Sequence, residues 1–246
     1  FSAPYDFDAI DMLDPYVPAY KIGSGDITWI EACLRIASKG KPVLLATGAS
    51  DIGDVQRAVD AILTVNPQLV LMQCNTNYTA DPANFDHIHL NVLKTYHDMY
   101  PQLILGLSDH TQGMATVLGA VALGARVIEK HFTDDNSREG PDHAFAMNPE
   151  SFAQMVSATR QLERAMGSGN KVVAANEKET VVIQRRCLRA ARAIQPGETL
   201  TREMIVVLRP ATPGAIMPYE IESVLGTRAL VPIAAGQELR WTMLGA

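Results

Sequence analysis

The sequence predicts an α/β protein made of a (β/α)8 TIM barrel without its first two β/α units, followed by a small β-rich C-terminal domain. From Ala19 onward, short aliphatic runs alternate with amphipathic segments about every 25 to 30 residues, as in β/α repeats. Polar residues follow nearly every run, at the strand ends where a barrel builds one common site. After residue 170, short segments separated by Pro and Gly replace this pattern and indicate a second domain.

Six runs are predicted to be barrel strands. Because they are apolar at nearly every position, they suit parallel strands covered on both faces, with the intervening helices as crossovers. Six strands are two fewer than a barrel of about 250 residues has, and the chain opens on Phe1, so we expect the first two units to be missing. An open doubly wound sheet is the alternative that needs no missing units. The runs are FSAP, AYKIG, PVLLATG, LVLMQC, LILGLS and RVIEKHF.

Helices are predicted between these strands. The segment from Ile52 to Val65 has apolar residues at helical spacing and follows the cap candidates Ser50 and Asp51. The last helix of the series begins after the cap candidate Asn148 and runs to Gly167. The repeating pattern ends there.

The chain divides into a partial barrel at 1–168, a linker at 169–185 and a small domain at 186–246. The small domain contains the turn-rich pieces IQPGETL, RPATPGAI and IAAGQEL and has no long amphipathic run. A module of roughly 60 residues folds alone only marginally, so we expect it to lean on the barrel or on a partner subunit.

Composition excludes several classes of protein. With 47% apolar and 20% charged residues the chain is globular, and no apolar run reaches the roughly 18 residues of a membrane helix. The first residues lack the features of a signal peptide, so we expect a soluble, cytoplasmic protein that does not bind membranes. A net charge of -6 argues against nucleic acid as a partner. Disulfides are not expected from three widely spaced cysteines, Cys33, Cys74 and Cys187.

Two histidines are predicted to meet at neighbouring strand ends. Side chains alternate along a strand, so Ser108 and His110 share one face, and Glu129 and His131 share the same face of the next strand. Two imidazoles with a nearby carboxylate and space for water suit an open divalent transition-metal site. The alternative is that either histidine is merely hydrogen-bonded at the barrel rim.

Lys21 ends an apolar strand, where an unpaired ammonium is costly to bury. It could bind a phosphate or form a Schiff base, and the alternative is a lysine that bends to solvent. The same segment supplies Ser24 as a substrate-binding candidate and Asp26 as a catalytic candidate. Glu129, His110 and His131 are the other catalytic candidates. Lys130, on the face opposite the histidines, is expected to be structural.

Three further strand-end residues are substrate-binding candidates, namely Thr47 in ATG and Thr76 and Tyr78 in CNTNY. Cys74 is expected to be a small barrel-lining residue rather than a nucleophile, because no histidine partner is indicated.

The loop after the last strand is dense in charge and holds Asp142 between Pro141 and His143. A positioned carboxylate there could hydrogen-bond sugar hydroxyls or move protons, and the alternative is a solvated acidic loop. His87 and His89 have a ligand-like spacing but lie in a polar segment, so we expect them at the surface.

Several of these motifs resemble the N-acetylneuraminate (sialic acid) synthase family in order and spacing. They are YKIGSGD, ATG, CNTNY, GLSDHT, ALGARVIEKHFT and GPDH. The tail, from RRCLRAARAIQPGETLTREMIVVLRPATPGAI through VLGTRAL to IAAGQEL, resembles the antifreeze-like (SAF) domain that ends these synthases. The resemblance covers essentially the whole chain.

The resemblance implies an enzyme that condenses phosphoenolpyruvate with N-acetylmannosamine or a related N-acylated amino-sugar aldehyde, giving a sialic-type acid and phosphate. It implies a divalent metal, Mn²⁺ with Mg²⁺ or Co²⁺ as alternatives, held by His110 and His131. The metal would polarise the aldehyde and orient water. Whether the acceptor is of the sialic, legionaminic or pseudaminic type stays open.

By the same resemblance, Lys21 and Ser108 match contacts to phosphoenolpyruvate, and Tyr78 and Asp142 match contacts to the amino sugar. Arg209 matches an arginine that reaches from the SAF domain into a neighbouring subunit's site. This implies a domain-swapped homodimer in which the small domain acts as a lid.

The chain departs from the family pattern near the phosphoenolpyruvate site, at Ala3, Ala46 and Thr76. Family contacts from the first two barrel strands have no counterpart, so we expect the 246-residue chain to be inactive on its own. Two other functions stay open: a Schiff-base aldolase that uses Lys21, and a non-catalytic carbohydrate- or ice-binding protein. The second gives no role to the strand-end histidines.

Overall fold

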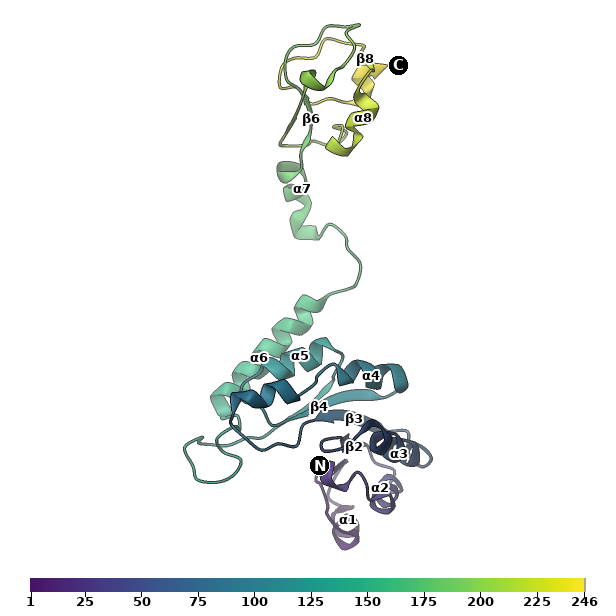
Figure 1. The fold of residues 1–246 in the computed structure, drawn as a ribbon, viewed down its shortest axis with the longest axis vertical. Coiled ribbons are helices and arrows are strands. Elements are labelled where there is room, and N and C mark those ends of the chain that lie inside the picture. The colour runs from purple at the N-terminus through teal and green to yellow at the C-terminus, as the bar shows by residue number, and fades with distance from the viewer. Residues whose placement is uncertain (246) are drawn as a thin grey trace. The chain divides into compact units, whose positions relative to one another are not determined.

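A computed structural model describes residues 1–245, which form two compact units (Figure 1). The larger unit spans Phe1–Ser168, and the smaller begins at Gly169. No helix within residues 1–245 has the length and apolar character needed to cross a membrane.

The larger unit is built on a curled sheet of five parallel strands in sequence order. FSAP, expected to be the end of a strand, forms no strand among residues 1–245: Ser2 makes an isolated parallel bridge to Tyr20, and its carbonyl accepts a hydrogen bond from the Lys21 amide. The prediction of six strands therefore overcounts the sheet by one. The strands are β1 Tyr20–Ile22, β2 Val43–Ala46, β3 Leu69–Cys74, β4 Ile104–Asp109 and β5 Val127–Lys130.

Helices connect successive strands. The helix predicted after Asp51 is confirmed. The Asp51 side chain caps α3 and forms a capping box with Asp54. Asn148 likewise caps the longest helix, which has Pro149 at its first position. The helices of this unit are α1 Phe7–Leu13, α2 Ile30–Ala37, α3 Ile52–Leu63, α4 Val92–Met99, α5 Ala115–Ala122 and α6 Pro149–Met166, with 3-10 turns at Ser24–Asp26 and Pro82–His87.

The two faces of the sheet have different neighbours. The outer face packs on helices through the main core, which includes Leu45, Leu71 and Leu107. The concave face carries a smaller apolar cluster around Leu44 and Met72. Successive side chains alternate between these faces, so the concave face is where the polar side chains at the strand ends can meet.

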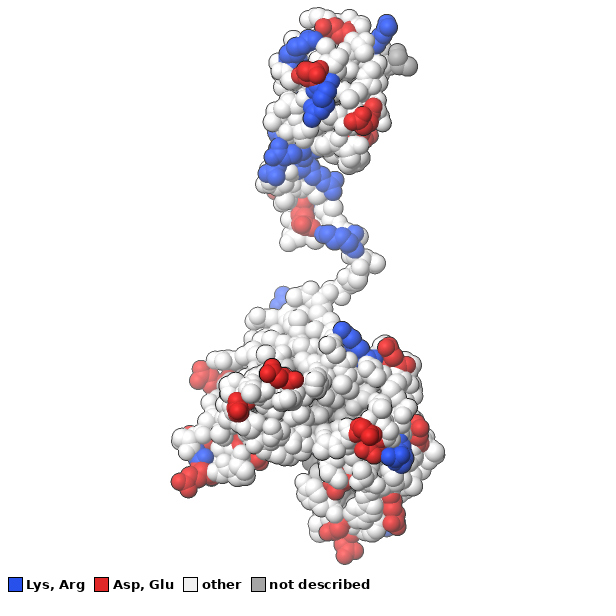
Figure 2. Space-filling view, in the orientation of Figure 1, with Lys and Arg blue, Asp and Glu red and all other residues white. Residues whose placement is uncertain are grey.

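The smaller unit has its own core and two antiparallel strand pairs. The segment expected to be a linker contains a helix, α7 Lys178–Gln184, and the carbonyl of Val182 accepts a hydrogen bond from the amide of Ala211. Figure 2 shows basic side chains gathered where α7 meets the rest of this unit. Its other elements are β6 Cys187–Ala190, β7 Ile205–Leu208, α8 Ile221–Val224, β8 Arg228–Ala229 and β9 Leu244–Gly245, with 3-10 turns at Ala175–Glu177, Arg202–Met204, Pro218–Glu220 and Trp241–Met243.

Candidate active site

The carboxyl ends of β1, β4 and β5 bring a lysine, a serine and a glutamate to the concave face. Ser108 and Glu129 are direct cross-strand neighbours, and the Lys21 ammonium nitrogen lies 3.2 Å from Oε2 of Glu129. That oxygen is buried and, within residues 1–245, has an ion-pair contact but accepts no hydrogen bond. A carboxylate oxygen has two acceptor positions, so this oxygen retains acceptor capacity beside its contact with Lys21.

His110 and His131 follow immediately after β4 and β5, and their ring centroids are 5.0 Å apart. Nδ1 of His110 lies 2.8 Å from the carbonyl oxygen of Asn75. Nδ1 of His131 lies 3.3 Å from Oδ2 of Asp142. Because Nδ1 of each ring has a partner, Nε2 is the nitrogen that each imidazole can offer to a ligand.

An aromatic wall surrounds the two imidazoles. The Tyr78 ring centroid lies 4.5 Å from that of His110 and 5.7 Å from that of His131. Phe145, which is buried, lies 5.0 Å from His131. The tyrosine is half exposed, so its hydroxyl is accessible to a polar ligand. Phe145 was not anticipated from the sequence, since it lies in an irregular loop without periodicity.

The expectation that Cys74 has no histidine partner is wrong. Its sulfur lies 3.9 Å from Nδ1 of His110 and 3.6 Å from Oγ1 of Thr76. Burial alone would raise the pKa of the thiol, but contacts with His110, Ser24 and Thr76 lower it below its usual value. Cys74 and Thr76 thus line the same concave end of the sheet as the imidazoles.

The two histidines have opposite pKa shifts. Burial would lower the pKa of His110, but the neighbouring Cys74 and the Asn75 carbonyl raise it. Burial lowers the pKa of His131, and His110 lowers it further, while Asp142 and Glu129 act in the other direction. At neutral pH His131 is therefore held in its uncharged form, which a metal ligand requires.

Ser24 and Thr76 approach each other across the turn that follows β2. Ser24 Oγ accepts a hydrogen bond of 2.9 Å from the amide of Gly48. A Cβ at Gly48 would lie 1.8 Å from Oγ1 of Thr76, so only glycine allows this approach. Asp26 lies nearby, and burial raises its pKa while Lys21 acts in the opposite direction.

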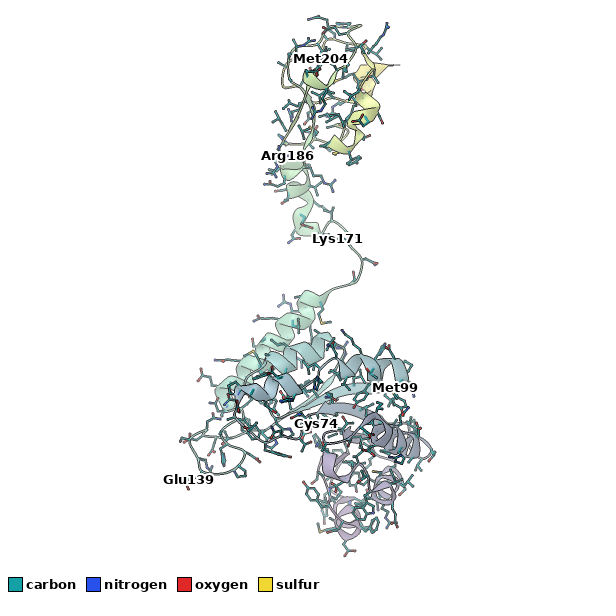
Figure 3. The ribbon with its side chains drawn as sticks, viewed as in Figure 1. Cys74, Met99, Glu139, Lys171, Arg186 and Met204 are labelled. Atoms are coloured by element: carbon teal, nitrogen blue, oxygen red, sulfur yellow. The ribbon has the colours of Figure 1, made fainter. Side chains whose placement is uncertain are left out.

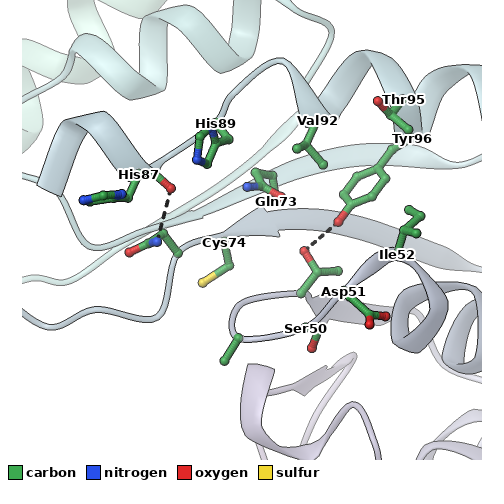
Figure 4. A pocket seen from close by; sticks show the side chains of 13 residues that line it. Ser50, Asp51, Ile52, Gln73, Cys74, His87, His89, Val92, Thr95 and Tyr96 are labelled. Atoms are coloured by element: carbon green, nitrogen blue, oxygen red, sulfur yellow. Dashed lines mark hydrogen bonds between the residues drawn. The ribbon is translucent and has the colours of Figure 1, made fainter.

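Thr47 is not brought to this group. Its hydroxyl donates to the carbonyl of Met72 at 2.9 Å and accepts from the Tyr96 hydroxyl at 3.0 Å, on the helix side of the sheet. It lines a cavity of about 750 Å³ together with Gln73 and Ile52, and Cys74 and Asn75 line this cavity as well (Figure 4). His87 and His89 also border this cavity and are exposed, as expected.

Asp142 reaches His131 from the long loop between β5 and α6. Figure 3 labels Glu139 at the outer part of this loop and Cys74 beside the sheet. Asn136 anchors the loop by donating to the carbonyls of His143 and Ala146, both at 2.8 Å. The loop is therefore folded against itself, which holds the exposed Asp142 carboxylate beside the imidazole.

Arg209 belongs to the smaller unit and lies just after β7. Its guanidinium donates a hydrogen bond of 2.7 Å to Oε1 of Gln184, at the end of α7. Within that unit it is exposed.

The donor set is suited to an open metal site rather than a closed one. Among residues 1–245 no three side chains of the His, Cys, Asp or Glu type converge as a ligand cluster. Two imidazole nitrogens would leave the remaining coordination positions to water and substrate, and they are one protein ligand fewer than catalytic zinc sites usually have. The carbonyl and carboxylate on the two Nδ1 atoms match the outer-shell partners that metal-bound histidines usually have.

Two family models match the chain. The NeuB family model covers residues 1–171, and the SAF domain model covers residues 185–245. A protein of Methanocaldococcus jannaschii with no described function is 40% identical over 211 residues, which are 85% of this chain and 61% of that protein. The N,N'-diacetyllegionaminic acid synthase of Legionella pneumophila is 36% identical over 251 residues, which cover 100% of this chain and 69% of that protein.

A solved structure is similar over nearly the whole chain. The crystal structure of a spore coat polysaccharide biosynthesis protein E from Chromobacterium violaceum aligns with a TM-score of 0.73 at 26% identity, over 99% of this chain and 73% of that chain. The chain thus spans about two thirds of the length of its curated relatives, from 61% to 69% for the two above. The match at family level nevertheless covers both units, and the chain belongs to the NeuB family and carries a SAF domain at its C-terminal end.

Proposed function

We propose that this chain is the greater part of a synthase that condenses phosphoenolpyruvate with an N-acylated amino-sugar aldehyde. The observation that carries the proposal is the meeting of His110, His131, Lys21 and Glu129 at one end of the curled sheet. The legionaminic acid synthase that matches the full length of the chain supports the same chemistry. The product would be a sialic-type nonulosonic acid and phosphate.

The architecture we propose for the whole protein is a (β/α)8 barrel. Five parallel strands with helices on the outer face make up more than half of such a barrel. The greater length of the relatives leaves room for two further β/α units. Under this proposal those units would complete the wall beside β1 and β5.

The reaction forms one carbon–carbon bond and one carbon–oxygen bond, and it breaks one carbon–oxygen bond. C3 of phosphoenolpyruvate attacks the aldehyde carbon, and the aldehyde oxygen takes a proton to become a hydroxyl. Water then adds at C2, and phosphate leaves with cleavage of the C2–O bond. The site must therefore hold an anion, orient an aldehyde and manage protons.

The side chains on the concave face can meet these needs. Lys21 and Ser108 would hold the carboxylate and phosphate of phosphoenolpyruvate, with Ser24 beside them. Glu129, whose buried Oε2 accepts no hydrogen bond, and Asp26, whose pKa is raised, would exchange protons with the reacting atoms. This assignment leaves Thr47 outside the site.

Tyr78 and Asp142 would bind the sugar. The Tyr78 ring lies over His110, and its exposed side can contact a pyranose or open-chain sugar. Asp142 accepts hydrogen bonds from hydroxyls while it also orients His131. The sugar would therefore approach from the side of the loop that carries Asp142.

The two histidines fit a resident divalent ion, with Mn²⁺ preferred and Mg²⁺ or Co²⁺ as alternatives. When bound, such an ion supplies Lewis-acid polarisation of the aldehyde and a bound water. His110 and His131 would hold it through Nε2, with their Nδ1 atoms fixed by Asn75 and Asp142. The low pKa of His131 keeps that ring ready to bind.

We also propose a domain-swapped homodimer in which Arg209 of one chain reaches the site of the other. The exposed guanidinium next to Gln184 is available for such a contact. A cation at the rim would neutralise phosphate and limit the entry of water.

The assay measures phosphate release with manganese, phosphoenolpyruvate and a panel of N-acetylmannosamine and diacetamido aldehyde sugars. It uses the 246-residue chain, and the same chain fused behind the preceding segment of the Legionella pneumophila synthase. We expect release from the fusion with at least one sugar and little from the chain alone. Release from the chain alone would contradict the need for two further units.

Borohydride trapping tests the aldolase alternative with the same proteins. A synthase should leave no reduced adduct on Lys21 and should lose activity with a chelator. A stable adduct, with turnover that survives the chelator, would replace the proposed function by Schiff-base chemistry.

A further inference from the structure

A buried ion pair lies directly behind the two histidines, on the helix side of the sheet. The Lys130 ammonium nitrogen is 3.0 Å from Oδ2 of Asp109, and the side chains are 1% and 0% exposed. These residues face away from the concave site and were not assigned a role in the reaction. The main core of the unit occupies the same side of the sheet, so the pair is out of reach of water.

Every polar atom around this pair has a partner. Oδ1 of Asp109 accepts hydrogen bonds from the amide and the hydroxyl of Thr111, at 3.0 and 2.9 Å. Oδ2 accepts from the hydroxyl of Thr116 at 2.6 Å, in the first turn of α5. Lys130 also donates to the carbonyl oxygen of Thr111. The pair therefore joins β4, β5 and α5 in one network.

The ion pair lies at the last rung of the β4–β5 ladder, immediately before the two histidines. Asp109 and Lys130 are the last cross-strand partners of β4 and β5. His110 and His131 directly follow β4 and β5, one residue beyond the last cross-strand pair. Thr111, the residue after His110, has both backbone groups bound: its amide donates to Asp109 and its carbonyl accepts from Lys130. The ion pair is thus the last fixed point before the imidazoles.

We propose that the Asp109–Lys130 pair is a positioning element that sets the separation of the two imidazoles and hence the affinity for a divalent ion. This inference rests on the proposed function, since it assigns a supporting role at the same site. It makes Asp109 and Lys130 positioning residues, because neither side chain touches the concave face. Groups that hydrogen-bond a metal ligand directly typically change metal affinity by about 10- to 100-fold, and this pair would act through the backbone of Thr111, next to His110.

A purely stabilising role explains the pair less well. Burying two charges carries a large desolvation cost, and apolar replacements of such pairs are often neutral or stabilising. A sheet that only needed to pack on α5 could use aliphatic side chains, as it does at Leu105 and Leu107. The hydrogen bonds to Thr111 define the position of the backbone next to His110, which aliphatic side chains cannot do.

The test measures Mn²⁺ affinity by electron paramagnetic resonance and thermal unfolding in the same samples. The key variant is Asp109→Asn/Lys130→Met, which removes both charges and keeps the hydrogen bond from the Thr111 amide. We expect Mn²⁺ to bind about 10-fold more weakly or worse while the unfolding midpoint stays near that of the parent chain. Lys130→Met alone should weaken binding and also lower the midpoint, because it leaves a buried carboxylate unpaired.

A matched control is available in the same unit. Lys41→Met breaks the ion pair with Asp14, whose atoms are 2.8 Å apart, without touching β4 or β5. It should leave Mn²⁺ affinity unchanged whatever it does to the midpoint. If the double variant does not fold, Thr116→Val replaces it, since this variant removes one hydrogen bond to Asp109 and should weaken binding about two- to fivefold.

The outcomes separate the two proposals. If the parent chain binds Mn²⁺ and a folded variant of the pair binds it within twofold of the parent, the positioning role is overturned and the proposed function stands. If neither the parent chain nor the fused protein of the phosphate assay binds Mn²⁺, the metal site of the proposed function fails and the inference fails with it. If only the fused protein binds it, the same variants are compared in that protein. Weaker Mn²⁺ binding by the double variant, with an unfolding midpoint near that of the parent chain, supports both the positioning role and the proposed function.

Discussion

His110 and His131 are held in different ways at the residue scale. The ring of His110 is buried and is fixed by a backbone carbonyl, whereas that of His131 is partly exposed and is fixed by the half-exposed carboxylate of Asp142. Removing the first imidazole opens a gap beside Cys74. Removing the second mainly opens the site to solvent, which makes His131 the cleaner position for a functional test.

His131→Ala should abolish manganese-dependent turnover and leave thermal stability nearly intact. The side chain is 25% exposed and its loss creates no closed cavity, so the structural effect should be small. Phosphate release in the fused enzyme and the unfolding midpoint are the measurements. His97→Ala, at an exposed position of α4, is the control and should change neither. Normal turnover in the His131 variant would contradict the ligand assignment.

Asp11 should titrate at unusually low pH. Hydrogen bonds from Arg35 and then Lys39 lower its pKa from 3.8 to about 2. Since the folded-state pKa is depressed, the contribution to stability is present above pH 3.8 and is lost as the pH falls toward 2. A carbon-13 NMR titration should show this, and Arg35→Met should move the carboxyl pKa upward. An unchanged value in that variant would exclude Arg35 as the cause.

The sequence could predict which residues share a face but not all of their partners. Strand alternation alone places Ser108 with His110 and Glu129 with His131, because the period of a strand is two. The contacts of Cys74 and Asn75 with His110 depend on how the irregular chain after β3 turns. No local pattern encodes that turn, so these partners came only from the structure.

Close packing between strands dominates at the scale of the elements. Gly106, in β4, faces Met72 of β3 and the backbone of β5. A Cβ at this glycine would lie 2.8 Å from Cγ of Met72 and 2.9 Å from the carbonyl oxygen of Val127. The second contact is with backbone, which cannot rotate away.

Gly106→Ala should therefore lower the free energy of unfolding by about 1–3 kcal/mol. Urea unfolding followed by circular dichroism gives the value. Gly169→Ala is the matched control, since nothing lies within 4 Å of an added Cβ there. Equal stability of the two variants would show that the strands separate freely at this point.

Strands and caps were well predicted because their signals are local. Aliphatic runs locate β1 to β5, and Asp51 and Asn148 mark the starts of α3 and α6. FSAP has the same local character, yet a strand also needs a paired neighbour, and only Ser2 finds one. The local sequence pattern of FSAP carries no information on whether a neighbouring strand pairs with it.

Two separately packed cores characterise the whole molecule. The backbone from Gly167 to Ala174 is exposed and has no regular structure. Limited proteolysis should cut within this segment first and release two fragments that stay folded. Thermal unfolding should show two transitions, and a single transition shared by both units would contradict independent folding.

The change in composition after residue 170 was enough to predict two units. It could not predict that α7 would pack on the smaller one, through Val182 and Ala211, because that contact joins segments far apart in the chain. Which acceptor sugar the site takes is likewise a property of side chains from several elements together. Local patterns carry little information of this kind.

The order of the sheet has a consequence for handling the protein. β5 is an outermost strand, and no strand of residues 1–245 pairs with its free side. Edge strands present backbone amides and carbonyls that can pair with edges of other molecules, although Met147 bridges the chain just past β5 at Phe132. Sedimentation coefficients should therefore climb as the chain is concentrated, and a short peptide that docks on β5 should reverse the climb. Colloidal behaviour would then depend on one strand rather than on the net negative charge.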